Sequence, residues 1–361
     1  MPINELYHTW FMKIRQLQPT ERITRIRNFT WLIVGIQQSR SVYLSRIAGK
    51  MPGKMKLLSF IQRLSRFLDN PAIDVHAWYE PIAGSWLANQ AGHLQQIRLI
   101  VDGTKVGFIH QLLIVSLAYR KRSILLAWTW VRQIKGHATP LVHLALLTHV
   151  RSLLAPVIAV LLVGDCEFGA VDVLKQLNAW RWDYVLRQKG RTHVCLSGQT
   201  EWHDFGSFVE KSGRSVWLGN GWLTQTKIYP VNMLAHWKVG EDEPWCLATN
   251  LPDRRMTLQA YARRMWIECN YANVCDLKSH GFDLECTMLR QANKLSRLTL
   301  AVALLYAWSL SIGTRTIQNS QRKQVDRKDR RDLSIFQIGL RFIECRLINL
   351  IPCPVNLCVY R

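Results

Sequence analysis

One run of six apolar residues, Ile158 to Val163, constrains the fold of this chain more than any other part of the sequence. The run lies between Pro156 and Gly164, and its length and composition predict a central strand that is buried on both faces. Asp165 follows Gly164 directly. The end of this strand is therefore a fixed point in the fold, and it carries an acid.

The segments on either side of this run predict a mixed α/β core. Upstream, three apolar segments of strand length lie between residues 94 and 131 and are separated by turns at 103–105 and 120–122. A helical pattern at 137–154 leads into the run, and a second helical pattern and a strand at 182–190 follow it. Three strands in a meander, a helix, a strand, a helix and a strand form the order of an RNase H-like core with a mixed sheet.

We expect three parts along the chain. Residues 1–90 form a helical DNA-binding domain, residues 91–313 form the catalytic core, and residues 314–361 form a basic loop and a C-terminal helix. The core contains an insertion at 191–256 whose glycine, threonine and tryptophan content predicts strands. In the first part, two short helices around a turn at 52–53 are compatible with a helix-turn-helix reader of DNA, and a plain helical bundle with a basic face is the alternative.

The net charge indicates the class of partner. The 361 residues include 47 lysines and arginines against 25 aspartates and glutamates, which gives a formal net charge of +22. This excess is larger than solubility requires and is spread along the whole chain, so it favours a polyanion such as DNA as the partner. A soluble protein that is merely basic is the alternative.

Cysteines and apolar stretches indicate where the chain works. The nine cysteines form no CxxC pair and no Cys/His set with zinc spacing, so we expect reduced thiols in a cytoplasm. The first residues lack the pattern of a secretory signal. The apolar stretch at 153–163 is too short to span a bilayer, and the stretch at 295–312 contains Arg297 and predicts a buried helix. We therefore expect no membrane partner.

Three acids occupy positions where a metal site can form. Asp102 follows the predicted strand at 97–101, Asp165 follows the central strand, and Glu268 lies in a helical pattern after the insertion. In an RNase H-like sheet the first and fourth strands are neighbours, so both aspartates come within reach of one metal pair. Carboxylates suit Mg²⁺, and two such ions about 3.5–4 Å apart can support phosphodiester cleavage. Each acid taken alone is more often a turn or helix-capping residue.

The residues before Glu268 strengthen this interpretation. Tyr261, Arg264 and Glu268 are spaced three and four residues apart, which places them on one face of a helix. An aromatic ring, an arginine and an acid on one face suit a site that faces DNA, with the arginine on a phosphate and the glutamate on a metal. A surface ion pair between Arg264 and Glu268 is the simpler alternative.

The pattern Tyr-x2-Arg-x3-Glu at 261, 264 and 268, together with VDGTKV around Asp102 and LLVGDCEFG around Asp165, resembles the DDE transposases of the bacterial IS4 family. The resemblance covers roughly residues 40–350, including the insertion. It implies that Asp102, Asp165 and Glu268 bind two Mg²⁺ ions, or Mn²⁺, and that Tyr261 and Arg264 contact transposon-end DNA. It also implies a homodimer on double-stranded DNA in the bacterial cytoplasm, associated with the nucleoid.

The chain departs from this family pattern after the glutamate. The pattern continues with a lysine at the position of Cys275, and the nearest lysine, Lys278, lies ten residues after Glu268, about 80° from its helical face. We assign Lys278 to DNA binding. Cys166 also stands where an arginine would be natural beside DNA. These changes are compatible with a bulged helix in an active enzyme or with a copy whose catalysis is impaired.

The resemblance further implies an aromatic side chain that holds a flipped base in members that form DNA hairpins. Among Trp217, Trp222, Trp237 and Trp245 we prefer Trp237, because the charged Lys238 follows it. Packing inside the insertion is the ordinary role of such tryptophans.

The resulting hypothesis is a cut-and-paste transposase. Metal-activated water cleaves at the transposon end, the freed 3′-hydroxyl attacks the opposite strand, and strand transfer into target DNA follows. A DNA-binding relic without cleavage is one alternative, and metal-dependent nicking distinguishes it. A structure-selective nuclease on the same core is another, and it would need no defined terminal repeat.

Overall fold

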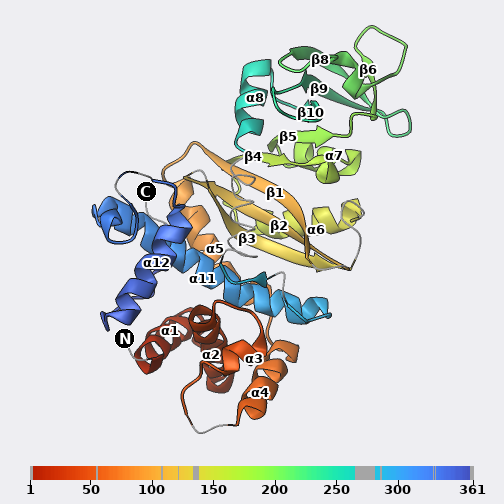
Figure 1. Cartoon of the computed structure of the whole chain (residues 1–361). Coiled ribbons are helices and arrows are strands. Elements are labelled where there is room, and N and C mark those ends of the chain that lie inside the picture. Colours follow the sequence, from red (N-terminus) through yellow and green to blue (C-terminus); the bar gives the residue numbers. More distant parts are fainter. Residues whose placement is uncertain are drawn as a thin grey trace. The chain divides into compact units, whose positions relative to one another are not determined.

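The computed structural model describes residues 3–53, 56–106, 109–120, 122–132, 138–264, 281–284, 287–327, 329 and 331–357 (Figure 1). The chain forms two compact units. Unit 1 contains Met1–Asn89, Val106–His110 and Asn270–Arg361, and unit 2 contains Gln90–Lys105 and Gln111–Cys269. The residues from 270 onward thus group with the N-terminal helices. The predicted boundaries near 90 and 313 remain predictions about domains.

A mixed sheet of ten strands organises unit 2 (Figure 1). Its strand order is β3-β2-β1-β4-β5-β10-β9-β8-β6-β7. In chain order the strands are β1 Gln96–Val106, β2 His110–Tyr119, β3 Arg122–Val131, β4 Ala159–Gly164, β5 Asp183–Gln188, β6 His193–Leu196, β7 His203–Asp204, β8 Ser215–Leu223, β9 Tyr229–His236 and β10 Trp245–Thr249.

The first half of this sheet confirms the predicted fold class. Strand β4 pairs in parallel with β1 on one side and with β5 on the other, and β2 pairs antiparallel with β3. Helix α6 (Pro140–Ser152) precedes β4, and the 3-10 turn η1 (Cys166–Phe168) and α7 (Val171–Ala179) follow it. Four of the six β4 residues are apolar and buried, from Val160 to Val163. Residues 159–163 of the predicted apolar run therefore lie in the central strand of an α/β core of the expected order.

The insertion continues the same sheet. Residues 191–256 contain β6 to β10 and the 3-10 turn η2 (Phe205–Phe208), so the prediction of strands is confirmed. Strand β10 pairs antiparallel with β5, and β9 and β8 extend from it, also antiparallel. The sequence predicted the strands but not their attachment, because pairing with β5 depends on contacts distant in the chain.

Unit 1 is helical (Figure 1). Its helices are α1 Ile3–Leu17, α2 Ile23–Ser39, α3 Leu44–Ala48, α4 Leu57–Asp69, α5 Val75–Ala91, α11 Ala292–Gln318 and α12 Ile335–Ile348, with the 3-10 turn η4 at Arg322–Gln324. Helices α11 and α12 cross at Gly313 and Gly339, where a Cβ on either residue would collide with the backbone of the other helix. The helices predicted for the first part are present, and DNA reading by α3 and α4 stays a prediction.

Helix α11 is the apolar stretch for which the sequence predicted a buried helix. It is long and apolar enough to cross a membrane by length and composition, but 94% of its most apolar window is buried inside the protein. Its one buried arginine, Arg297, donates hydrogen bonds to the carbonyl of Leu68 in the last turn of α4 (2.8 Å) and to that of Ile73 after it (3.2 Å). The charge thus satisfies backbone acceptors, and the prediction of a core helix is confirmed.

Candidate active site on the central strands

Strands β1 and β4 bring the two predicted aspartates to the same level of the sheet. The strands pair in parallel with Val101 opposite Gly164, and Asp102 and Asp165 each come one residue later. The sequence placed Asp102 after its strand, but β1 continues to Val106. Pairing with β2 keeps Gly103 inside the sheet despite the low strand propensity of glycine. Asp102 therefore lies within β1, and only Asp165 lies at a strand end.

Gly164, which precedes Asp165, allows strands β1, β4 and β5 to pack closely. A Cβ on Gly164 would lie 2.5 Å from Val101 Cγ1 and 3.0 Å from Leu186 Cδ2. A larger residue at this position would therefore push β4 away from its neighbours β1 and β5. Gly164 explains why the apolar run stops one residue before the acid: the site needs close backbone packing there.

Arg264 lies between the two aspartates. Its Nη2 is 3.9 Å from Asp102 Oδ1 and 3.5 Å from Asp165 Oδ2. The side chains of Arg264 and Asp102 are only 5% and 4% exposed, whereas that of Asp165 is 24% exposed. Buried charges are tolerated only when opposite charges lie nearby, so this arginine compensates the acids. The distances are those of Coulombic attraction rather than of short hydrogen bonds.

Tyr261 supports Arg264 from helix α8 (Arg254–Ala262). The Asp253 side chain caps this helix by accepting a hydrogen bond from the Met256 amide (2.9 Å). The Tyr261 ring is fully buried and packs edge-on against Trp245, with ring centroids 5.0 Å apart. The Arg264 guanidinium lies 5.8 Å from the centroid of the Tyr261 ring. Contact of Tyr261 with DNA remains a prediction, and in this structure its ring is part of the core.

Helix α8 ends earlier than the sequence suggested. Its last residue is Ala262, and the Arg264 amide bonds to the Tyr261 carbonyl in a tighter turn. Arg264 is buried. The alternative of an ion pair with Glu268 stays open, because Glu268 lies outside the described residues. Its assignment to a DNA phosphate remains a prediction. Glu268, Cys275 and Lys278 lie outside the described residues, so their predicted roles remain predictions.

Glu167 lies beside this site and was not predicted from the sequence. Both of its carboxylate oxygens accept hydrogen bonds from the Gln111 amide on β2, at 2.8 and 2.7 Å. A Cβ on Gly103 would lie 2.5 Å from both Gln111 Nε2 and Glu167 Oε2. The pair therefore packs directly on the glycine that follows Asp102. A second acid two residues after Asp165 was a visible signal, but its partner Gln111 is brought near only by the sheet.

Two groups near Asp165 carry no charge at neutral pH. Burial, with a further contribution from Asp165, raises the pKa of the Cys166 thiol. Burial also lowers the pKa of His143 on α6 to about 4, and its ring packs against Phe168 with centroids 4.5 Å apart. Among the described residues, charged groups at the site include Asp102, Asp165, Arg264 and Glu167, and Arg187 and Lys189 also act on Cys166.

Asp102 and Asp165 fit a hard divalent cation in kind, because both present carboxylate oxygens at one place. Among the residues that the structure describes, no three His, Cys, Asp or Glu side chains lie close enough together to hold a metal ion. The positive charge between the acids comes from Arg264. Asp102 and Asp165 would hold a metal, with Arg264 displaced from between them.

The tryptophans of the insertion differ in exposure. Trp237 follows β9, is partly buried, and donates a hydrogen bond to the Glu241 carbonyl (2.9 Å). Trp245 is buried in the core, with Trp217 packed against the same cluster. Trp222 is 41% exposed. The choice of Trp237 as a base-stacking residue remains a prediction, and Trp222 is a more accessible candidate of the same kind.

No protein-family model matches the chain, and no curated protein matches its sequence. A cryo-electron microscopy structure of the piggyBac transposase synaptic complex with hairpin DNA is similar over 98% of this chain and 83% of that one, at 10% identity and a TM-score of 0.45. A crystal structure of Marinitoga piezophila Argonaute with guide RNA and target DNA is similar over 70% and 37%, at 8% identity and a TM-score of 0.24. Likenesses this weak carry no argument about this chain.

Proposed function

We propose that this protein is a DNA transposase that cuts and joins phosphodiester bonds at the acid pair of β1 and β4. The observation that carries the proposal is the placement of Asp102 and Asp165 at one level on adjacent parallel strands. The sequence resemblance to IS4-family DDE transposases and the net charge of +22 support it. Glu268 is the proposed third carboxylate, and double-stranded DNA at insertion-sequence ends is the proposed substrate.

The chain's own residues divide the work in this proposal. Asp102 is buried within β1 and Asp165 is more accessible, so the two acids present one buried and one partly exposed carboxylate to the reacting phosphate. When bound, two Mg²⁺ ions would activate the attacking oxygen and stabilise the leaving one. Arg264 holds the acids in place in the structure described here and would move to the phosphate when DNA binds.

The assembly and setting are part of the same proposal. Cleavage and joining of two ends in one reaction requires both ends to be held together, so we propose a homodimer on DNA. The reduced cysteines are compatible with work in the cytoplasm, on nucleoid DNA.

A cleavage assay tests this function. Duplex DNA that carries the sequences flanking the gene is incubated with the protein in Mg²⁺ or Mn²⁺ and, in parallel, in EDTA. We expect metal-dependent cutting, and we expect Asp165→Asn to reduce it at least about 100-fold while DNA binding is retained. Asp172→Asn, which changes an exposed acid on α7 paired with Lys227, is the matched control and should cut normally.

The Cys275→Lys variant distinguishes an impaired copy from a wrong assignment. Cutting by this variant alone would mean that the unmodified chain is disabled at position 275. Absence of cutting by both the parent and the Cys275→Lys variant, with DNA binding retained, would favour a transposase relic that only binds DNA. Normal cutting by Asp165→Asn would show that the acid pair is not the active site.

A further inference from the structure

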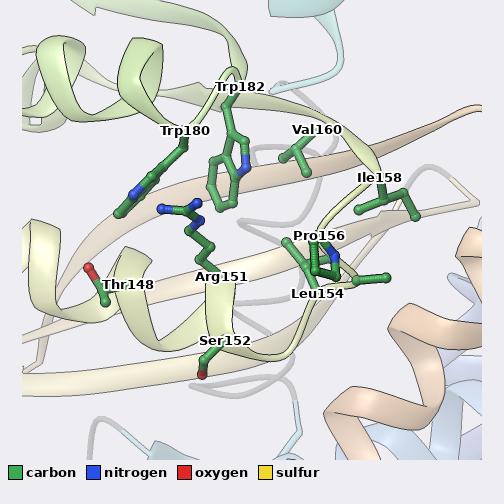
Figure 2. A pocket seen from close by; sticks show the side chains of 10 residues that line it. Thr148, Arg151, Ser152, Leu154, Pro156, Ile158, Val160, Trp180 and Trp182 are labelled. Carbon is green, nitrogen blue, oxygen red and sulfur yellow. The ribbon is translucent and has the colours of Figure 1, made fainter.

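A cavity of about 380 Å³ lies at the other end of β4 (Figure 2). Two tryptophans, an arginine and two hydroxyl side chains line it together with apolar residues: Thr148, Arg151, Ser152, Leu154, Ala155, Pro156, Ile158, Val160, Trp180 and Trp182. The volume falls in the range of sites for small ligands. The acids and the cavity lie at opposite ends of β4, which has six residues and is about 20 Å long as extended chain. The cavity is therefore distinct from the acid pair.

The two tryptophans form an aromatic corner. Their ring centroids are 5.2 Å apart and their planes are tilted by 57°. The Arg151 guanidinium lies 5.0 Å from the centroid of Trp180, and in Figure 2 it lies beside both rings. Trp182 is buried, whereas Trp180 is partly exposed. A flat ring that enters the cavity would therefore find an aromatic face and a guanidinium plane to stack on.

An unusual helix end creates this corner. Helix α7 closes with the Trp182 amide bonded to the Leu177 carbonyl (3.0 Å) and the Arg181 amide bonded to the Asn178 carbonyl (2.9 Å). This is a Schellman motif, which needs a left-handed residue that is usually glycine. Here the residue is Arg181, with φ +58°. Arg181, which is exposed and lies between Trp180 and Trp182 in the sequence, therefore has a strained backbone conformation.

The arginines at this end of the sheet are not neutralised internally. In the part of the chain that the structure describes, neither Arg151 nor Arg181 forms an ion pair with an acid, and both are exposed. Arg264, by contrast, lies against two aspartates. Arg151 lines the cavity, and Arg181 lies in the sequence between the two lining tryptophans. Exposed cations at an aromatic cavity match the chemistry of a nucleotide, which has a flat ring and an anionic phosphate.

We propose that this cavity binds one unpaired nucleotide of a DNA strand, with the base against Trp180 and Trp182 and the flanking phosphates on Arg151 and Arg181. The choice of DNA rests on the proposed function, whereas the choice of an unpaired nucleotide rests on the cavity. A paired base is stacked on both faces and cannot enter, so the site selects single-stranded or flipped-out DNA. This site differs from the base-stacking role predicted for Trp237 in the insertion.

Fluorescence anisotropy with the full chain in EDTA tests the proposal without cleavage. The probes are a labelled single-stranded oligothymidylate and a labelled duplex of equal length. Trp180→Ala and Arg151→Ala are expected to weaken single-strand binding at least about fivefold each, and duplex binding less than about twofold. Trp202→Ala, which removes a partly exposed tryptophan elsewhere in unit 2, is the matched control and should leave both affinities unchanged.

Arg181→Gly is the sharpest variant, because glycine suits the left-handed position and cannot disrupt the turn. We expect this chain to be more stable than the parent but weaker in single-strand binding. Photocrosslinking of an oligonucleotide with 5-iododeoxyuridine should place the crosslink on Trp180 or Trp182.

Unchanged single-strand affinity in all three variants would overturn the proposal, as would equal loss for duplex. Crosslinks confined to other tryptophans would do the same. The outcome is separable from the cleavage assay. If the variants lose single-strand affinity selectively but the parent chain does not cut DNA, the nucleotide site is supported and the proposed reaction is not. If the parent cuts DNA and the variants keep their single-strand affinity, only the nucleotide site is ruled out.

Discussion

The charged side chains near the two ends of strand β4 differ in whether they have partners of opposite charge. At the Asp165 end, two aspartates and Arg264 lie close together and are largely shielded from water. At the Ile158 end, Arg151 lies on the Trp180 ring without an acid partner among the described residues. A buried charge must be paired with an opposite charge inside the protein, whereas an exposed charge can remain unpaired and available to a ligand.

Helix α6 contacts both ends. Near its first turn His143 packs against Phe168, just after the acid end of β4. In its last turn Arg151 packs against Trp180. The buried residue is held neutral by its surroundings and the exposed one is charged, so the two ends of this helix show the same contrast as the two ends of β4.

The largest expected effect comes from removing the charge at the buried end. Arg264→Leu would leave Asp102 and Asp165 without this compensation, and we expect the free energy of unfolding to fall by about 3–5 kcal/mol. Urea denaturation measures the change. Because a divalent cation can supply the missing positive charge, millimolar Mg²⁺ should stabilise this variant more than the parent chain.

Arg255→Leu is the matched control for that prediction, since Arg255 is exposed on helix α8, which ends two residues before Arg264. It should change stability by less than about 0.5 kcal/mol. A similarly small effect of Arg264→Leu would contradict the view that Arg264 compensates the charges of the buried acids. The two ends of β4 would then not differ in how charge affects stability.

A smaller effect is expected from backbone packing at the acid end. Gly164→Ala would place a methyl group 2.5 Å from Val101 Cγ1, so we expect a loss of about 1–3 kcal/mol in the free energy of unfolding. Gly84→Ala in helix α5 has open space around the new methyl and should gain about 0.5–1 kcal/mol. Equal effects of the two substitutions would show that the sheet adjusts freely around Asp165.

The smallest expected effect is a pH dependence from His143. Burial lowers its pKa to about 4, so between about pH 4 and 6.5 the unfolded chain binds more protons than the folded one. The contribution to stability is present above about pH 6.5 and is lost as the pH falls toward 4, by about 1–2 kcal/mol at pH 5.5 and by more below it.

Comparison of the parent with His143→Leu at pH 7 and pH 4.5 measures this loss. The variant should lack that part of the acid sensitivity, whereas His8→Leu, at an exposed position on α1, should retain it. If His143→Leu and the parent lost stability in parallel, His143 would not be the group that titrates.

The sequence determined the fold class, the two aspartates and the strands of the insertion. Each of these depends on local pattern: the apolar run before Asp165, the strand before Asp102 and the alternation of strands and helices are written in neighbouring residues. The end of α8 was less predictable, because the last helical turn depends on how Arg264 is buried rather than on spacing.

Only the tertiary structure decided how distant residues meet. Arg264 neutralises Asp102 and Asp165, Glu167 bonds to Gln111, and β10 attaches the insertion to β5. The arginine and tryptophan cavity likewise joins α6 to the turn after α7. None of these contacts is visible as a periodic pattern in the sequence. Buried charges and backbone groups are paired with whichever partner the packing of distant segments brings within reach.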